Sequence, residues 1–320
     1  MVWQNRRAFL ALAAALAARP VRAQAKPASL VVPFAPGGGH DSMARILAGP
    51  LGEQLGQTVL VENRPGANGM IGAEYVVRAR PDGATFLFAS PAEIVIAPST
   101  YKSMRYDWTR DLAAVCLAGT TPIAIVAHPS AGVRTLGEAL ELARKRPGLA
   151  YGTPGEGSSM HLAGAWLAKL SGADLTAVHY KGAGPATNDV VAGHIPLAIV
   201  GIAPVLPFIR SGKLVALAVT SRARVDWLKD VPTVAESPGM TGFEATHWEG
   251  VFLPGKTPDA IVQRLQAAFA AVLHQPAIAK QLLDIGIDPV GGTTAEFRAF
   301  LAEDRERFAK MYGYTGLQPE

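Results

Sequence analysis

The chain has 320 residues, of which 49% are hydrophobic, and it carries 30 lysines and arginines against 26 aspartates and glutamates. The basic excess comes from the first 25 residues, which hold four arginines and no acid, so the remaining chain balances at 26 against 26. This neutrality excludes the basic surface that nucleic acid or an anionic membrane would attract, and the single cysteine, Cys116, excludes an intramolecular disulfide.

Residues 1–25 have the pattern of a secretory signal peptide. Arg6 and Arg7 precede an Ala/Leu run over 10–18, and small residues at Ala23 and Ala25 give two cleavage positions. The run is shorter than the roughly 20 residues that span a bilayer. The arginine pair fits either twin-arginine or general secretory export. We therefore predict that the chain is exported and works without this segment.

Apolar runs alternate with helical patterns over residues 26–320, which predicts an α/β fold with mainly parallel strands. The expected strands are 30–34, 58–62, 85–89, 123–127, 150–151, 175–180, 197–200, 214–219 and one within 243–253. The expected helices are 42–55, 70–78, 135–145, 160–170, 186–192, 205–211, 258–273, 276–283 and 297–311. Pro50 predicts a kink or break in the first helix, and Thr294 is the expected cap of the last one.

The strands 123–127 and 214–219 bracket the middle block and are the expected crossing points between two domains. We predict a discontinuous first domain over 26–122 and 220–320 and a second domain over 123–219. The length of the chain after the signal suits one large domain or two ordinary ones. Cys116 lies in the run DLAAVCLAG and is expected in the core as a small hydrophobic residue.

Two stretches share a pattern of strand, glycine-rich loop and helix: LVVPFAPGGGHDS over 30–42 and LAYGTPGEGSSMH over 149–161. A helix N-terminus offers unpaired N–H groups and a partial positive charge, so such a loop forms an anion pocket. Asp41 or Ser42 is the expected cap of the first helix, and Ser158 or Ser159 that of the second. Taken singly, each stretch also fits an ordinary strand-to-helix loop.

Neither loop matches a nucleotide-binding motif. A P-loop ends in Gly-Lys-Ser/Thr, and no lysine follows Gly39 or Gly157. The dinucleotide pattern begins at Gly155 but meets Met160 where its third glycine belongs. We therefore predict no cofactor.

Seven motifs, in order along the chain, resemble the Bug family of periplasmic receptors of tripartite tricarboxylate transporters: VVPFAPGGGHDSMARILA, VENRPGANGMIGAE, PDGATFLFAS, YGTPGEGSSMHLAG, HYKGAG, GKLVALAVTS and VPTVAES. The resemblance implies a type II periplasmic binding protein fold, with two α/β domains around a ligand cleft. It implies that a small carboxylate bridges the two glycine loops and is delivered to a membrane permease. We expect a monomer in the periplasm that performs no chemistry.

The two loops, the strand ends and the resemblance together give the expected ligand-binding residues. They are Phe34, Gly37, Gly38, Gly39, Asp41, Ser90, Ala92, Thr153, Gly157, Ser158, Ser159, His161, Lys181 and Val200. The chain departs from the family at Val200, where members usually have an acidic residue followed by asparagine. Because that acid would serve a polar or cationic end of the ligand, Val200 favours a carboxylate with an apolar or aromatic distal part, unless the valine only faces the core.

The alternative function is a secreted hydrolase that uses Ser158 or Ser159 with His161. The chain lacks the G-x-S-x-G turn of such enzymes, and a serine and a histidine on one helical turn seldom align as nucleophile and base. The seven histidines show no H-x-x-x-H or H-x-x-E-H spacing, so the sequence predicts no metal site.

Overall fold

The computed structural model describes residues 26–315, and the predicted signal peptide lies outside them. It confirms the α/β prediction. Three short parallel strands form one edge of the sheet, with β1 (Ala28–Val32) between β2 (Val59–Asn63) and β3 (Thr85–Ala89). The apolar residues of β1 and β3 are buried on both faces, as is typical of parallel strands joined through helices, whereas Leu60 of the edge strand β2 is exposed.

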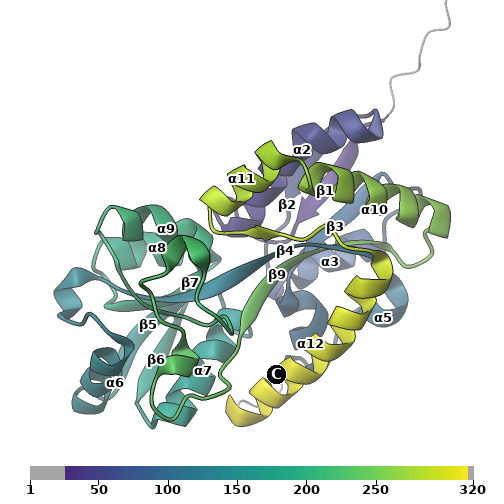
Figure 1. Cartoon of the computed structure of the whole chain (residues 1–320). Helices are drawn as coiled ribbons and strands as arrows, with labels where there is room; N and C mark the ends of the chain where they lie inside the picture. Colours follow the sequence, from purple (N-terminus) through teal and green to yellow (C-terminus); the bar gives the residue numbers. More distant parts are fainter. Residues whose placement is uncertain (1–25, 316–320) are drawn as a thin grey trace, which may run out of the picture.

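Two long antiparallel strands, β4 (Leu112–Ala127) and β9 (Thr246–Pro254), join this edge to the rest of the sheet (Figure 1). β9 pairs with β3 and, up to Pro122, with β4. Residues 123–127 of β4 pair instead with β7 (Leu197–Gly201) and β8 (Val215–Val219). The sequence predicted only the 123–127 part of β4, because the preceding run of small apolar residues has no alternating pattern to identify a strand.

We call β1, β2, β3, β9, β10 (Asp288–Pro289) and residues 112–122 the first sheet half. The second sheet half consists of residues 123–127, β5 (Leu149–Thr153), β6 (Leu175–His179), β7 and β8. β5 lies between β6 and β7 and is parallel to both. Cys116 is fully buried in the first half, as predicted.

Helices gather around each sheet half (Figure 1). Those from the chain segments that flank the middle block are α2 (Gly39–Leu55), α3 (Met70–Val77), α4 (Ala97–Thr100), α5 (Trp108–Asp111), α10 (Asp259–Leu273), α11 (Pro276–Asp284) and α12 (Thr294–Thr315). Those of the middle block are α6 (Leu136–Lys145), α7 (Ser159–Ser171), α8 (Ala183–Val191) and α9 (Ile202–Arg210). Single turns complete the set: η1 (Ala67–Gly69), η2 (Ala92–Ile96), η3 (Pro129–Ala131), η4 (Asp226–Leu228) and η5 (Val234–Glu236). None of the described helices has the length and apolar composition of a membrane span.

The first helix differs from its prediction at its start and at Pro50. α2 begins at Gly39, and its cap is the extended Gly38 rather than Asp41 or Ser42. The Asp41 carboxylate instead accepts a hydrogen bond from the N–H of Gly37 at 3.1 Å, within the loop. No break occurs at Pro50; the helix continues to Leu55 and ends at Gly56, which adopts the left-handed conformation typical of a helix end.

The cap of α12 is Thr293, not the predicted Thr294. The Thr293 hydroxyl accepts a hydrogen bond from the N–H of Glu296 at 3.2 Å, and the Glu296 carboxylate accepts one from the N–H of Thr293 at 2.7 Å. This reciprocal pair is a capping box. The Thr294 hydroxyl donates instead to the carbonyl of Val115 at 2.7 Å, which ties α12 to β4.

We expect Thr293→Ala to lower the free energy of unfolding by about 1 kcal/mol, because it removes the acceptor for the first turn of α12. Thr293→Ser keeps the hydroxyl, so its free energy of unfolding should remain within a few tenths of a kcal/mol of the wild-type value. Urea denaturation of the three proteins measures the difference. An equal loss in both variants would show that the methyl group, rather than the cap, matters.

Helix α12 also packs against α7, so the middle block and the C-terminal helix share one apolar core. Leu162 and Leu167 of α7 lie in the same buried cluster as Phe308 and Met311 of α12. Near them the ring of Trp166 stacks on Phe243 at 4.3 Å. This packing places α7 beside β9, and both elements contribute to the cavity described next.

Candidate functional site

A cavity of about 600 Å³, counted to its open mouth, lies where the two sheet halves meet. Much of its wall consists of helix starts and the residues just before them: Gly38 and Gly39 at α2, Ser90 and Ala92 at η2, Ser158 and Ser159 at α7, Gly182 and Ala183 at α8, and Gly201 and Ala203 at α9.

Four long helices therefore direct their N-termini at one cavity. Three of them are capped by glycines, namely Gly38, Gly182 and Gly201, and none of these helices has a side-chain cap. Only α7 is capped by a side chain, since the Ser158 hydroxyl accepts from the N–H of His161 at 3.2 Å, as predicted for this serine. First-turn N–H groups without a side-chain cap are available to a ligand, and the helix dipoles favour a negatively charged one.

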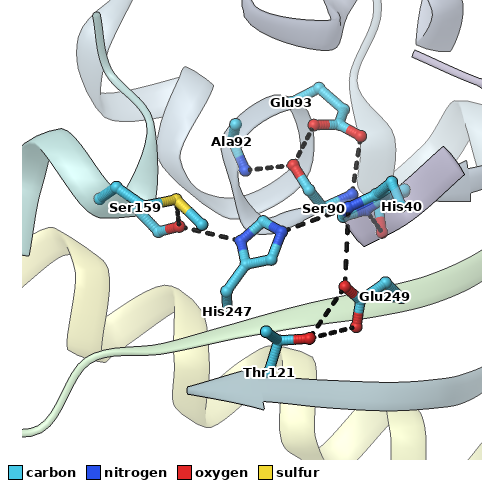
Figure 2. Close-up of polar contacts among 10 residues, drawn as sticks. His40, Ser90, Ala92, Glu93, Thr121, Ser159, His247 and Glu249 are labelled. Atoms are coloured by element: carbon cyan, nitrogen blue, oxygen red, sulfur yellow. Dashed lines mark hydrogen bonds and ion pairs between the residues drawn. The ribbon is translucent and has the colours of Figure 1, made fainter. Parts of the chain in front are cut away.

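Three polar side chains that line this cavity, His40, His247 and Glu249, lie close together (Figure 2). His247 and Glu249 are two residues apart on β9 and so lie on one face of the strand, while His40 comes from the first turn of α2. All three are buried. We call them the floor triad.

Hydrogen bonds fix the tautomers of the two imidazoles. Nε2 of His40 lies 3.2 Å from the carbonyl of Ala89, which can only accept, so this nitrogen carries the hydrogen and Nδ1 of the neutral ring does not. Nε2 of His247 then donates to Nδ1 of His40 at 3.3 Å, and the hydroxyl of Ser159 donates to Nδ1 of His247 at 3.0 Å. This chain of hydrogen bonds links α7, β9, α2 and the end of β3.

Burial keeps the floor triad uncharged at neutral pH. It lowers the pKa of His40 to about 4 and that of His247 well below its ordinary value, and it raises the pKa of Glu249 to about 8. The hydroxyl of Thr121 donates to the Glu249 carboxyl group and opposes part of that rise. A neutral floor does not repel an anion that the surrounding helix N-termini attract.

Seven of the residues predicted from the sequence line the cavity: Phe34, Gly38, Gly39, Ser90, Ala92, Ser158 and Ser159. Lys181 lies in an adjoining hollow that shares Phe34, Ala35, Pro154 and Gly182 with the cavity. The remaining predicted residues line neither space; they are Gly37, Asp41, Thr153, Gly157, His161 and Val200.

Two of these remaining residues are occupied by contacts inside the protein. The Asp41 carboxylate accepts hydrogen bonds from Arg45 and Asn63 as well as from the N–H of Gly37. Val200 is fully buried in an apolar cluster of the second sheet half, and the neighbouring Gly201 is the residue that reaches the cavity. The valine therefore faces the core.

Sequence reasoning missed His40, Thr121, Gly182, Ala183, Gly201, His247 and Glu249 at the cavity. A signal exists for two of them, because the alternation of polar His247 and Glu249 with apolar Trp248 is typical of a strand whose two faces differ. Trp248 does lie on the other face, where its indole N–H donates to Asp304 at 2.7 Å. Gly182 and Gly201 each follow a predicted strand and precede a predicted helix, so they repeat the pattern of the two glycine loops.

The geometry does not support the hydrolase alternative. The Ser158 hydroxyl donates to the carbonyl of Gly155 at 2.7 Å, and His161 accepts from the N–H of Gly157 at 3.0 Å, so these two side chains serve the loop. Ser159 does reach an imidazole, that of His247, but the other ring nitrogen of His247 faces His40 rather than a carboxylate. A serine nucleophile needs a base oriented by an acid, which this histidine lacks.

Residues 43–317 match the model of the tripartite tricarboxylate transporter family receptor. The chain is 35% identical over 312 residues to the protein BugT of Bordetella pertussis, covering 96% of this chain and 95% of the relative. Among solved structures, it resembles Rpa4515 of R. palustris with adipate (TM-score 0.89, 32% identity, 92% of this chain and 99% of the other). It also resembles MatC of Rhodopseudomonas palustris with bound malate (TM-score 0.84, 28% identity, 90% of this chain and 99% of the other). The α/β fold is thus that of a periplasmic binding protein, and the chain belongs to the Bug family of tripartite tricarboxylate transporter receptors.

Proposed function

We propose that this protein captures a small carboxylate in the periplasm and delivers it to the membrane permease of a tripartite tricarboxylate-type transporter. The observation that carries the proposal is the convergence of the N-termini of α2, α7, α8 and α9 on one cavity with a neutral floor. An anion is the ligand that such a site favours. The two similar structures that hold adipate and malate support a carboxylate in particular.

The walls support a ligand with an apolar part. Phe34, Met160 and Pro204 line the same cavity as the helix starts. A carboxylate group at the helix N-termini and an aliphatic or aromatic segment against these side chains satisfy both kinds of surface. This assignment rests on the residues that line the cavity and not on Val200, which is in the core.

Capture follows from two lobes closing on the ligand. We assign 26–122 with 220–320 to one lobe and 123–219 to the other, with the linking segments at the change of partners in β4 near Pro122 and at the end of β8. The cap of α2 belongs to the first lobe, and the caps of α7, α8 and α9 belong to the second. A ligand that contacts both lobes only when they are closed stabilises the closed form through its differential affinity. We expect residues 1–25 to direct export and the exported protein to act as a monomer.

A thermal-shift screen of the exported chain tests the proposal, after denaturation and refolding to remove any bound ligand. The panel contains mono-, di- and tricarboxylates, aromatic acids and amino acids, each with the matching amide as control. At a hundredfold excess over Kd, the best carboxylate should stabilise the protein by about 2.7 kcal/mol and raise Tm by roughly 5 °C or more. Equal shifts with acid and amide, or turnover of an ester at Ser159, would contradict it.

A further inference from the structure

The floor triad combines two imidazoles and a carboxylate, which are the ligands of many transition-metal sites. One ligand atom from each of His40, His247 and Glu249 lies within 4.8 Å of the other two. Nδ1 of His40 is 3.3 Å from Nε2 of His247 and 3.7 Å from Oε1 of Glu249. Ligand atoms around a tetrahedral zinc ion stand roughly 3.4 Å apart, given metal–ligand bonds of about 2.0–2.2 Å. Two of the three distances in the triad are close to this spacing, and the third, between His247 and Glu249, is no more than 4.8 Å.

Each ligand also has a partner that would orient it toward an ion. Nε2 of His40 donates to the carbonyl of Ala89, so the lone pair of Nδ1 faces the triad, where it accepts from His247 in the absence of an ion. Glu249 is held by the hydroxyl of Thr121, at 3.2 and 3.4 Å from its two oxygens. Protein metal sites fix their ligands through such outer hydrogen bonds.

The third ligand, His247, needs only a change of tautomer. Its Nδ1 lies 3.0 Å from the hydroxyl oxygen of Ser159, which can accept a hydrogen bond as well as donate one. When the ring hydrogen moves from Nε2 to Nδ1, Nε2 becomes a ligand and Nδ1 donates to Ser159. The Ser159 hydroxyl hydrogen then has a second acceptor in the sulfur of Met160 at 3.3 Å. In this tautomer the Nδ1 hydrogen and the Ser159 hydroxyl hydrogen both have acceptors already in place, and Nε2 faces the ion.

Without an ion, the triad leaves bonding capacity unused. A single hydroxyl hydrogen from Thr121 is shared between both oxygens of Glu249, and Oε1 is 3.7 Å from His40, which is longer than a hydrogen bond. Buried carboxyl groups normally have more partners than this. All three triad residues line the cavity, so an ion held by them would have an open position toward the ligand space.

We propose that His40 Nδ1, His247 Nε2 and a Glu249 carboxylate oxygen bind a divalent transition-metal ion of the zinc class, and that a carboxylate of the ligand completes its coordination. The ion replaces the proton of the Glu249 carboxyl group, which is released to solvent as the ion binds. Imidazole ligands favour zinc and its transition-metal neighbours over magnesium and calcium. The metal site stands on the triad alone, whereas the carboxylate at its open position rests on the function proposed above.

Titration of the chelator-treated protein with Co²⁺ and Zn²⁺ tests the metal site without any carboxylate. We expect one ion per chain, visible Co²⁺ absorption bands of a site with few ligands, displacement of Co²⁺ by Zn²⁺, and no competition from Mg²⁺. Glu249→Gln keeps the shape of the side chain and its bond from Thr121, and it should weaken Zn²⁺ binding at least tenfold. His247→Gln should also weaken Zn²⁺ binding at least tenfold.

His179→Gln is the matched control, because it removes an imidazole that lies beside His161 and outside the triad. The His179→Gln variant should bind Co²⁺ and Zn²⁺ with the stoichiometry and affinity of wild type. Circular dichroism and urea denaturation check that each variant folds, and Glu249→Gln decides the question if His247→Gln does not fold. Absence of one-to-one binding in the wild type, or equal binding by wild type and Glu249→Gln, would overturn the metal site.

Adding adipate or malate to the Co²⁺-loaded protein tests the open position. A change in the Co²⁺ bands with a rise in Tm supports coordination of the carboxylate. If Co²⁺ binds but no carboxylate changes the bands or Tm, the triad is a metal site and both the open-position proposal and the carboxylate function fail. If carboxylates stabilise the metal-free protein and Co²⁺ does not bind, the function stands and the metal site fails.

Discussion

Ala183→Asp should abolish carboxylate capture while leaving the protein folded. Ala183 is the first residue of α8 and lines the cavity, and a Cβ on Gly38 of the opposite lobe would lie 4.0 Å from its own Cβ. An aspartate here places a negative charge where the ligand carboxylate is expected. Two like charges about 4 Å apart repel by roughly 4 kcal/mol near a protein surface, so we expect Kd to rise at least about 100-fold.

The same substitution should not weaken the fold. An acidic residue in the first turn of a helix is favourable by about 0.3–1 kcal/mol, so the ligand-free variant should be as stable as wild type or slightly more so. Ala183→Asn is the matched control, with the same shape and no charge, and should raise Kd less than about tenfold. Calorimetric titration with the carboxylate that gives the largest thermal shift measures all three proteins. Equal losses of affinity in Ala183→Asp and Ala183→Asn would show that space, and not charge, limits binding.

The parts of the site that could be predicted from sequence are those encoded locally. A strand, a glycine loop and a capping serine occur within a dozen residues of one another, so local pattern alone could place Gly38, Gly39, Ser158 and Ser159 at the site. Ser90 could be placed in the same way, because it directly follows the buried strand β3. Parallel strands bring such ends to one edge.

The floor triad could not be predicted in this way. His40 and His247 are 207 positions apart, and their contact depends on the pairing of β9 with β3 and β4. Short-range spacing rules for histidine motifs cannot register a contact formed by sheet topology. Asp41 failed for a related reason: it resembles a ligand or cap residue in sequence, but Arg45 and Asn63 take up its carboxylate in the fold.

Glu93→Gln should remove a large part of the pH dependence of stability. Glu93 is fully buried behind the cavity wall, in η2, and its two carboxyl oxygens accept from the N–H of Ser90 at 2.7 Å and the hydroxyl of Ser90 at 2.6 Å. Burial raises the pKa of Glu93 from 4.5 to about 7, and the bonds from Ser90 offset only part of this rise. A carboxyl group whose pKa is higher in the folded state binds a proton on folding, so its contribution to stability is complete below pH 4.5 and is lost as the pH rises through 7.

The shift corresponds to about 3 kcal/mol of stability lost by wild type between pH 4.5 and pH 8 through this group. The glutamine of the variant keeps an oxygen to accept from the Ser90 N–H and gains an amide that can donate to the Ser90 hydroxyl, so it reproduces the protonated acid at every pH. Buried Glu249 and Asp304, whose pKa values are also raised, are present in both proteins and cancel in the comparison.

Urea denaturation of wild type and Glu93→Gln at pH 5, 6, 7 and 8 should therefore show a stability difference that grows with pH in favour of the variant. Glu53→Gln, on the exposed side of α2, is the control and should show no such growth. A constant difference across this range would mean that Glu93 is ionised in the folded protein, held by Ser90 in spite of its burial.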